Sequence, residues 1–192
     1  MLERLDIDII WLPNLSTPEE LLSSIKTVSE RLSRIEAAKT LIEDVNRDLT
    51  QAAANFSNWT EDAPTVLFLL EPLGKSTSGM GGGLKSKADT LIRLAGGMNV
   101  ATRFSGFKPV SAESLIAMNP DLILVGQSDR HGGSPESIQA MITTPAFSEV
   151  SAIKKSAVYA VPLDDLAFGP RLGEVTLRWN SLLAKHASPV SP

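Results

Sequence analysis

Between residues 18 and 56, apolar side chains recur at steps of three and four positions, which is the spacing of one face of an α-helix. The series consists of Leu21, Ile25, Val28, Leu32, Ile35, Ile42, Val45, Leu49 and Phe56, with Ala38 in its one gap. Ser16 or Thr17 can cap the start, and no Gly or Pro occurs between residues 19 and 59. The pattern therefore predicts a single helix over residues 18–56, about 58 Å long at about 1.5 Å per residue. Such a helix either packs across a domain as a rigid support or forms one helix of a coiled-coil dimer.

After Pro64 the pattern changes to short apolar runs at residues 65–71 (TVLFLLE), 122–127 (LILVGQ) and 157–162 (AVYAVP). Continuous apolar runs of this length are typical of parallel strands that are buried on both faces. Helix-like segments at residues 86–97, 111–121, 134–147 and 169–186 alternate with them. The alternation predicts an α/β fold, a parallel sheet flanked by helices and preceded by the long helix. Residues 6–12 (DIDIIWL) are predicted to form one further short strand.

Composition and charge exclude several classes of function. The net charge of −4 gives no electrostatic reason to bind nucleic acid, which usually requires a basic surface. Cysteine is absent, so disulfides, thiolate catalysis and cysteine-bound metals are excluded. No apolar run approaches the ~18 residues of a membrane-spanning helix.

The segment EPLGKSTSGMGGG (residues 71–83) invites a nucleotide-binding interpretation, but its spacing is wrong for one. A P-loop would need glycine at position 69, which is Leu69, and a dinucleotide fingerprint would need glycine at position 84, which is Leu84. The segment is instead predicted to be a long loop at the carboxyl end of a buried strand, where ligands of α/β proteins bind. Lys75 offers positive charge and Met80 an adaptable apolar contact. A surface loop without a ligand is the alternative.

Two further segments follow predicted strands in the same way. One carries Arg130 and His131 between glycines, and the other carries Phe168 and Arg171 before the last helix. Because the carboxyl ends of parallel strands meet at one edge of a sheet, the three segments together predict a rim for an anionic ligand. A solvated loop histidine is the alternative for His131.

Several stretches resemble the substrate-binding proteins of bacterial ABC importers for iron chelates and vitamin B12. They are GGGLKSKADTLIRLAGGMNVA (81–101), GFKPVSAESLIAMNPDLILV (106–125), TTPAFSEVSAIKKSAVYAVP (143–162), FGPRLGEVTLRW (168–179) and LSTPEELLSSIKTVSERL (15–32). The glycine-rich segment and FGPR are most similar to the haem-binding branch. The resemblance implies the helical-backbone metal-receptor fold (class III periplasmic binding protein), in which two α/β lobes are joined by a helix and clamp the ligand between them.

The resemblance also implies a division of the chain. Residues 1–16 correspond to the last strand of a first lobe, residues 17–59 to the interlobe helix and residues 60–192 to the C-terminal ligand-binding lobe. We therefore expect a fragment that lacks most of the first lobe and a signal peptide, and that comes from a periplasmic protein. Because the helix and the first strand would then lack packing partners, we expect a homo-oligomer or a domain-swapped dimer.

The ligand and partners implied by the resemblance are haem, as transported cargo, and an ABC permease with its ATPase. Haem propionates would meet Lys75, Arg130 or Arg171. His131 is the first candidate for an iron ligand and Met80 the second. Glu113 matches the position that docks onto arginines of the permease, although a glutamate in the first turn of a helix also stabilises the helix dipole.

Three alternatives remain. A ferric siderophore or a corrinoid would be a ligand within the same family. A doubly wound α/β enzyme is a second class, but no motif-supported triad, carboxylate pair or metal cluster is present, so we expect no enzymatic activity. An oligomeric scaffold built on the long helix is a third class.

Overall fold

The computed structural model describes residues 9–56, 63–73, 78–128 and 133–187. A six-stranded mixed sheet forms its centre, in the order β4-β2-β1-β5-β6, with β3 paired to the start of β1. The strands are β1 (Thr65–Glu71), β2 (Ser78–Gly82), β3 (Met98–Asn99), β4 (Phe107–Ser111), β5 (Leu122–Gln127) and β6 (Val158–Pro162). Strands β1, β5 and β6 are parallel, while β2 is antiparallel to both β1 and β4.

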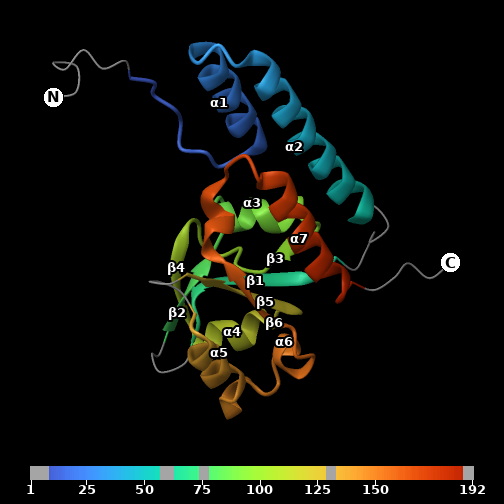
Figure 1. Ribbon diagram of the computed structural model, residues 1–192. Coiled ribbons are helices and arrows are strands. Elements are labelled where there is room, and N and C mark those ends of the chain that lie inside the picture. Colours follow the sequence, from blue (N-terminus) through green and yellow to red (C-terminus); the bar gives the residue numbers. More distant parts are fainter. Residues whose placement is uncertain (1–8, 57–62, 74–77, 129–132, 188–192) are drawn as a thin grey trace.

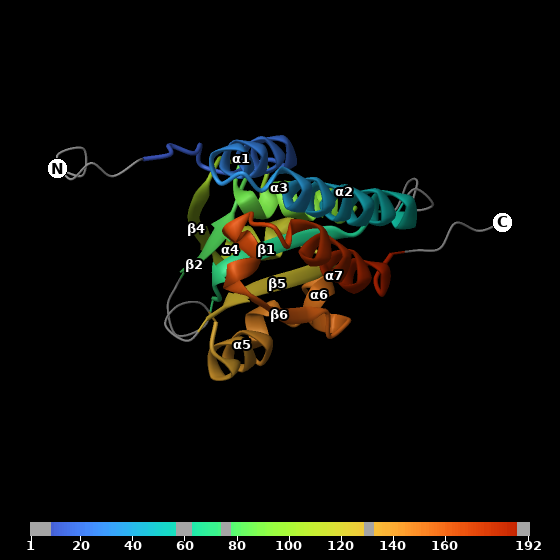
Figure 2. The ribbon, with the colours of Figure 1, turned by 45° about the horizontal axis from the view of Figure 1, so that its top comes forward.

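Helices cover both faces of the sheet (Figures 1 and 2). On one face lie α3 (Lys87–Leu94) and α7 (Leu172–Ala184), and α2 (Ile35–Phe56) packs on α7. On the other face lie α4 (Ala112–Met118), α5 (Pro135–Ile142) and α6 (Ser151–Lys154). The remaining elements are α1 (Pro18–Arg31) and two 3₁₀ turns, η2 (Pro145–Phe147) and η3 (Leu163–Ala167). The arrangement confirms the predicted α/β class.

The core explains the apolar runs of the sequence. Residues 66–69 of β1 and 122–125 of β5 are completely buried, because helices lie against both faces of these central strands. The indole of Trp179 on α7 is also fully buried and stacks on the ring of Phe68, with ring centroids 5.9 Å apart. Such aromatic contacts add about 0.5–1.5 kcal/mol to the stabilisation from burial.

The prediction of one continuous helix over residues 18–56 is wrong, because the chain turns at residues 32–34. Ser33 adopts a left-handed conformation (φ 53°). The Arg34 N–H donates to the Ser29 carbonyl (2.8 Å) and the Ser33 N–H to the Glu30 carbonyl (3.3 Å), which is the Schellman arrangement that ends helices. As a result, Leu32 and Ile35 lie at the tip of a helical hairpin and are 62% and 60% exposed. Helix α2 alone is about 33 Å long.

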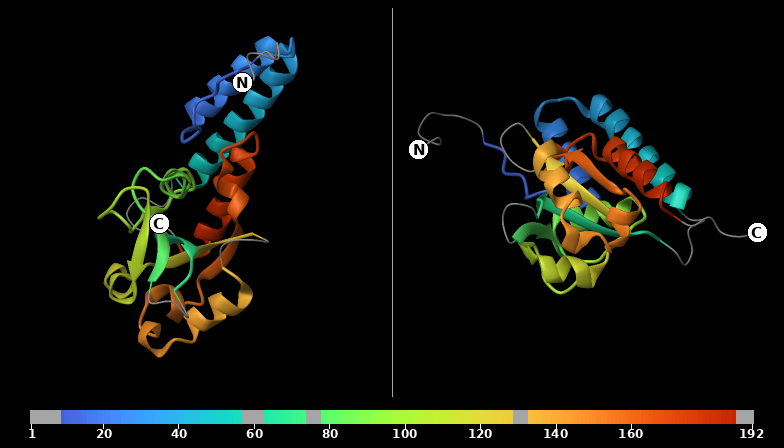
Figure 3. Two further views of the ribbon diagram at one scale, coloured as in Figure 1. Left: turned by 90° about the vertical axis from the view of Figure 1, so that its left-hand side faces the viewer. Right: turned by 90° about the horizontal axis from the view of Figure 1, so that it is seen from below.

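The close packing of α2 on α7 follows from small side chains. Ala38, Val45 and Ala52 recur every seven residues and are the buried positions of α2. On α7, a Cβ at Gly173 would come within 2.6 Å of the Asp48 Cβ, so this position admits only glycine at the observed helix separation. This contact attaches the hairpin firmly to the sheet domain, whereas α1 is held mainly by α2 (Figure 3).

Other expectations are confirmed with shorter bounds or corrected. The four helices predicted after residue 86 are present as α3, α4, α5 with η2, and α7. The glycine-rich segment is not a loop throughout, because residues 78–82 form β2, and β4 was not predicted. Residues 9–12 form no strand, and the rest of the strand predicted at 6–12 lies outside the described residues. Among the helices of the described ranges, none is both long and apolar enough to cross a membrane.

Candidate functional site

The carboxyl ends of β1, β5 and β6 lie at one edge of the sheet, as predicted. The three strands are adjacent and parallel, with Leu69 opposite Val125 and Gln127 opposite Pro162. We use the term carboxyl rim for residues 71–73, 127–128 and 162–171 at this edge (Figure 1). Hollows lie along this rim. One, of about 430 Å³, involves Gln127, Ser128 and Pro162, and another, of about 180 Å³, involves residues 164–165 and 167–172.

Met80 lies beside the end of β1. Strand β2 runs antiparallel to β1, and Met80 pairs with Glu71, the last residue of β1. The Met80 side chain is half-buried. The structure therefore places Met80 next to the carboxyl rim, whereas Lys75, in the connection between β1 and β2, lies outside the described residues.

The glycines of β2 serve close packing of the chain. A Cβ at Gly79 would come within 2.5 Å of the Glu71 carbonyl oxygen, and one at Gly81 within 2.5 Å of a Val110 methyl. A Cβ at Gly83 would overlap both the ring and the carbonyl of Phe104. Contacts this short exclude any side chain, so Gly79 and Gly81 let β2 fit between β1 and β4, and Gly83, just after β2, lets the chain pass close to Phe104. This is a different use of glycine from the phosphate cradle excluded on the spacing of the motif.

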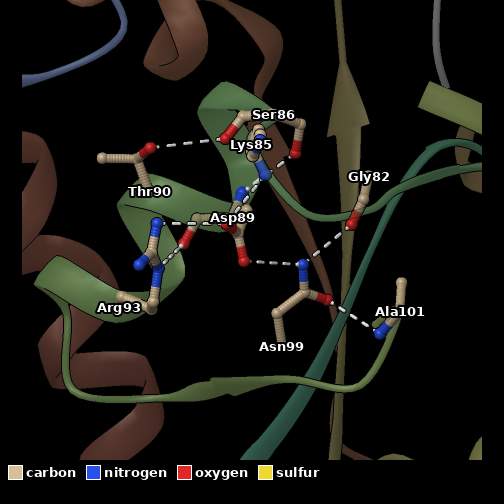
Figure 4. Close-up of polar contacts among 8 residues, drawn as sticks. All are labelled: Gly82, Lys85, Ser86, Asp89, Thr90, Arg93, Asn99 and Ala101. Carbon is tan, nitrogen blue, oxygen red and sulfur yellow. Dashed lines mark hydrogen bonds and ion pairs between the residues drawn. The ribbon is translucent and has the colours of Figure 1, made fainter. Parts of the chain in front are cut away.

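A buried carboxylate fixes the turn that follows β2 (Figure 4). Ser86 caps α3 by accepting from the Asp89 N–H (3.1 Å), and Asp89 Oδ2 accepts from the Lys85 N–H (3.0 Å). The Asp89 side chain thus bonds to the N–H of the residue before the N-cap, rather than to that of the N-cap itself as in a capping box. Arg93 Nη2 contacts the same oxygen at 3.1 Å from the solvent side. Lys85 is thereby held at positive φ (60°).

Asn99 connects this cap to the sheet (Figure 4). Its Nδ2 donates both to Asp89 Oδ1 (3.1 Å) and to the Gly82 carbonyl (3.0 Å), and its Oδ1 accepts from the Ala101 N–H (3.0 Å). Asn99 and Asp89 are both buried. The network therefore holds the end of β2, and with it Met80, relative to α3. Sequence reasoning missed it, although the Ser-x-x-Asp spacing before an apolar run was a usable signal.

After the end of β6, the structure separates Phe168 from Arg171, the two residues predicted there to contact the ligand. Phe168 is only 1% exposed, adopts φ 46°, and packs in the core, so its ring is not presented to solvent at the rim. Arg171 is exposed at the start of α7. Within the described ranges, no hydrogen bond or ion pair involves its guanidinium. Asp165 ties η3 to α7, because its carboxylate accepts from Arg178 Nη2 and from Trp179 Nε1 (2.7 Å). This contact fixes the segment that presents Arg171.

Arg130 and His131 lie outside the described residues, so their proposed roles remain predictions. Glu113 is exposed near the start of α4 and is not part of the carboxyl rim. Hydrogen bonds from its own backbone N–H and from the Ser111 hydroxyl lower the pKa of the Glu113 carboxyl below its usual value. The side chain therefore remains a solvent-exposed anion at neutral pH.

Tyr159 and His186 form a polar pair that the pattern of the sequence did not indicate. Tyr159 Oη lies 2.9 Å from His186 Nε2, just beyond the carboxyl end of α7. Burial, followed by the positive charges of Lys155 and Lys185, lowers the pKa of the His186 imidazole. The pair therefore anchors the end of α7 to β6, far along α7 from Arg171. In the described part of the chain, no group of three or more His, Cys, Asp or Glu side chains could hold a metal ion.

Comparisons with known proteins agree with this architecture. A family model described as periplasmic binding protein matches residues 2–164. No curated protein matches the sequence. Among solved structures, the periplasmic haem-binding protein BhuT, bound to two haems, is 24% identical with a TM-score of 0.81, covering 97% of this chain and 70% of its own.

Two more structures show the same fold. The haem-binding protein HutB of Vibrio cholerae is 26% identical with a TM-score of 0.79, covering 95% of this chain and 70% of its own. A protein of Staphylococcus epidermidis described as a possible iron-binding (periplasmic solute-binding) protein is 17% identical with a TM-score of 0.78. The match covers 95% of this chain and 68% of the Staphylococcus protein. The chain thus spans about two thirds of the length of these proteins.

Proposed function

This chain belongs to the periplasmic binding protein family, and we propose that it acts in the periplasm as a substrate-binding component of an ABC importer, with haem as its cargo. The observation that carries the proposal is the carboxyl rim. It is formed by three adjacent parallel strands in a chain whose fold matches that of haem-binding proteins. The role is binding and release of a ligand, without its chemical conversion.

The chemistry of haem suits the side chains assigned to this rim. Haem is a flat apolar ring with two carboxylates, so its site needs apolar contacts and cationic groups. Met80 beside the end of β1 supplies a polarisable contact, and Arg171 is a cation whose guanidinium can bind a propionate through two parallel hydrogen bonds. Lys75 and Arg130 are proposed as further propionate contacts. His131 is proposed as an iron ligand, because neutral imidazole binds haem iron.

Buried Phe168 has a supporting place in this proposal. Its ring anchors the segment 168–171 in the core, and Arg171 follows three residues later at the rim. Any haem contact by Phe168 itself would require its ring to leave the core.

The partner proposed for this lobe is an ABC permease with its ATPase. Glu113 is exposed and its pKa is lowered, so it can present a negative charge to arginines of the permease. This contact would lie on α4, outside the carboxyl rim, and would leave the ligand site free.

Titration with hemin, followed by the Soret absorbance, tests the proposed ligand. We expect saturable binding by the wild-type chain. Arg171→Glu should bind about 10- to 100-fold more weakly, since one charge-assisted contact contributes about 1.5–3 kcal/mol. The matched control is Lys39→Glu, which makes the same change of charge at an exposed position of α2 that is not a rim residue.

An unchanged Soret band with wild-type protein would contradict the assignment of haem. Parallel titrations with a ferric siderophore and with a corrinoid, followed by intrinsic tryptophan fluorescence, then test the two other ligands of this family. Equal weakening by Arg171→Glu and Lys39→Glu would show that the rim is not where hemin binds.

A further inference from the structure

A second concave site lies at the far side of the sheet from β6. It is a pocket of about 330 Å³ between α4, β4 and residues 100–104. Its walls include Arg103, Phe104, Pro109, Ser114, Ala117 and Met118. The pocket shares no residue with the carboxyl rim, so ligand binding at the rim does not occupy it.

Glu113 stands at the margin of this pocket. On a helix, residues four apart lie on the same face, and Ala117, four residues after Glu113, lines the pocket together with Ser114. The exposed Glu113 therefore lies on the same face of α4 as the pocket-lining Ala117. A partner that engages Glu113 is thereby brought beside the pocket.

Arg103 supplies a charge of the opposite sign on another wall. It belongs to the segment after β3, its side chain is exposed, and it lines the pocket. Over the ranges that the structure describes, no hydrogen bond or ion pair engages its guanidinium. The pocket also offers apolar contacts from Phe104, Pro109 and Met118. Such a cavity suits a side chain with an apolar stem and a negative end.

We infer that Glu113 and this pocket form one docking surface of mixed charge for the permease. A basic group of the permease meets Glu113, while a neighbouring acidic side chain of the permease enters the pocket and pairs with Arg103. The inference rests on the proposed function, because it specifies what the permease must present. A partner with basic groups alone would be repelled by Arg103, and the repulsion grows as the contact is desolvated. An anionic lipid surface would be repelled by Glu113.

The two charges have a physical consequence for specificity. A single salt bridge at an exposed carboxylate contributes little and does not define an orientation. Adding a second contact of opposite sign, with a side chain inserted in a pocket, fixes the register of the complex and disfavours permeases that lack the acidic group.

Binding to the cognate permease–ATPase complex in lipid nanodiscs tests the inference. The full chain and three variants are compared, and each variant is first checked for an unchanged melting temperature and an unchanged hemin titration. Arg103→Glu should weaken binding at least about 10-fold. Ala117→Trp, which fills the pocket from an exposed position, should weaken it as well. Lys108→Glu is the matched control, because Lys108 is an exposed cation on β4 that does not line the pocket; we expect a change of no more than about twofold.

The outcomes separate the two proposals. Wild-type binding with equal affinity for Arg103→Glu would overturn the inference and leave the importer function standing. Equal losses for Arg103→Glu and Lys108→Glu would also overturn it, because net charge would then explain both. If the wild-type chain does not bind the permease complex while hemin still binds, the docking role is wrong as a whole.

Discussion

Removal of the Asp89 carboxylate is the sharpest test of what holds β2 beside the rim. The side chain is 4% exposed and accepts hydrogen bonds from the Lys85 N–H, which would lose its partner, and from the Asn99 amide, which would keep its bond to the Gly82 carbonyl. A hydrogen bond to a charged group contributes about 1.5–3 kcal/mol, and the exposed pair with Arg93 adds less than about 1 kcal/mol. We therefore expect Asp89→Ala to lower the free energy of unfolding by about 3 kcal/mol.

For a chain of this size, a loss of that magnitude corresponds to a decrease of about 6–12 °C in the melting temperature. Circular dichroism melts and urea titrations measure it. Asp89→Asn should cost about half as much, because its amide oxygen can still accept from one of the two donors. The control is Asp164→Ala, which removes an exposed carboxylate and should change stability by less than about 0.5 kcal/mol. If Asp89→Ala matched that control, the network would not be what fixes the turn after β2.

Three further predictions address other parts of the molecule. Burial opposes a lowered pKa of the Asp121 carboxyl, but hydrogen bonds from the Thr65 hydroxyl and Lys155 outweigh it and lower the pKa to about 2. The stabilisation from this carboxylate should be fully present above its unfolded pKa of 3.8 and be lost, by about 1–2 kcal/mol after allowance for solvent screening, as the pH falls through 2. Urea titrations from about pH 5 to about pH 2 should show a smaller decrease in the free energy of unfolding for Asp121→Asn than for wild type. Gly83→Ala should destabilise by about 1–3 kcal/mol through overlap with Phe104, and a melting temperature equal to wild type would contradict the packing role of this glycine. An apolar groove of about 370 Å³ between α1 and α2 lies near Leu12 and Leu32, and Trp11 is 86% exposed. We expect a second copy of the chain to cover this surface, so light scattering should give a mass of about 41 kDa, twice the 20.6 kDa of one chain. The mass should fall to about 20 kDa for Leu32→Glu, whereas a monomeric wild-type chain would refute the dimer.

Patterns carried by the local sequence predicted the sheet well. The runs at 65–71 and 122–127 match β1 and β5 residue for residue, because continuous apolar segments bounded by Pro and Gly have few other uses. Serines at 86, 111 and 134 mark helix starts through their caps, and each accepts a hydrogen bond from the N–H three residues later. The common edge of the three parallel strands followed from their order in the chain.

The sequence-based predictions were wrong where tertiary contacts override the conformational preference of the local sequence. Ser33 ends α1 in a left-handed conformation without the glycine that normally signals such an end, so the periodic pattern continued through the turn. The glycines of β2 were interpreted as a loop because their neighbours, Phe104 and Val110, are distant in sequence. Phe168 was assigned to the rim by its position, although its left-handed backbone conformation turns the ring into the core. Because the long helix is broken, it gives no support to the clamp architecture, which rests on the family match.

Hydrogen exchange with and without hemin tests the central claim most directly, since it shows where on the chain a flat anionic ligand binds. We expect slower exchange at residues 71–73, 127–128 and 163–171, with little change in α1 and the adjoining half of α2. Protection confined to α1 and residues 35–41, or no protection at the three strand ends, would contradict the assignment of the ligand site to the carboxyl rim.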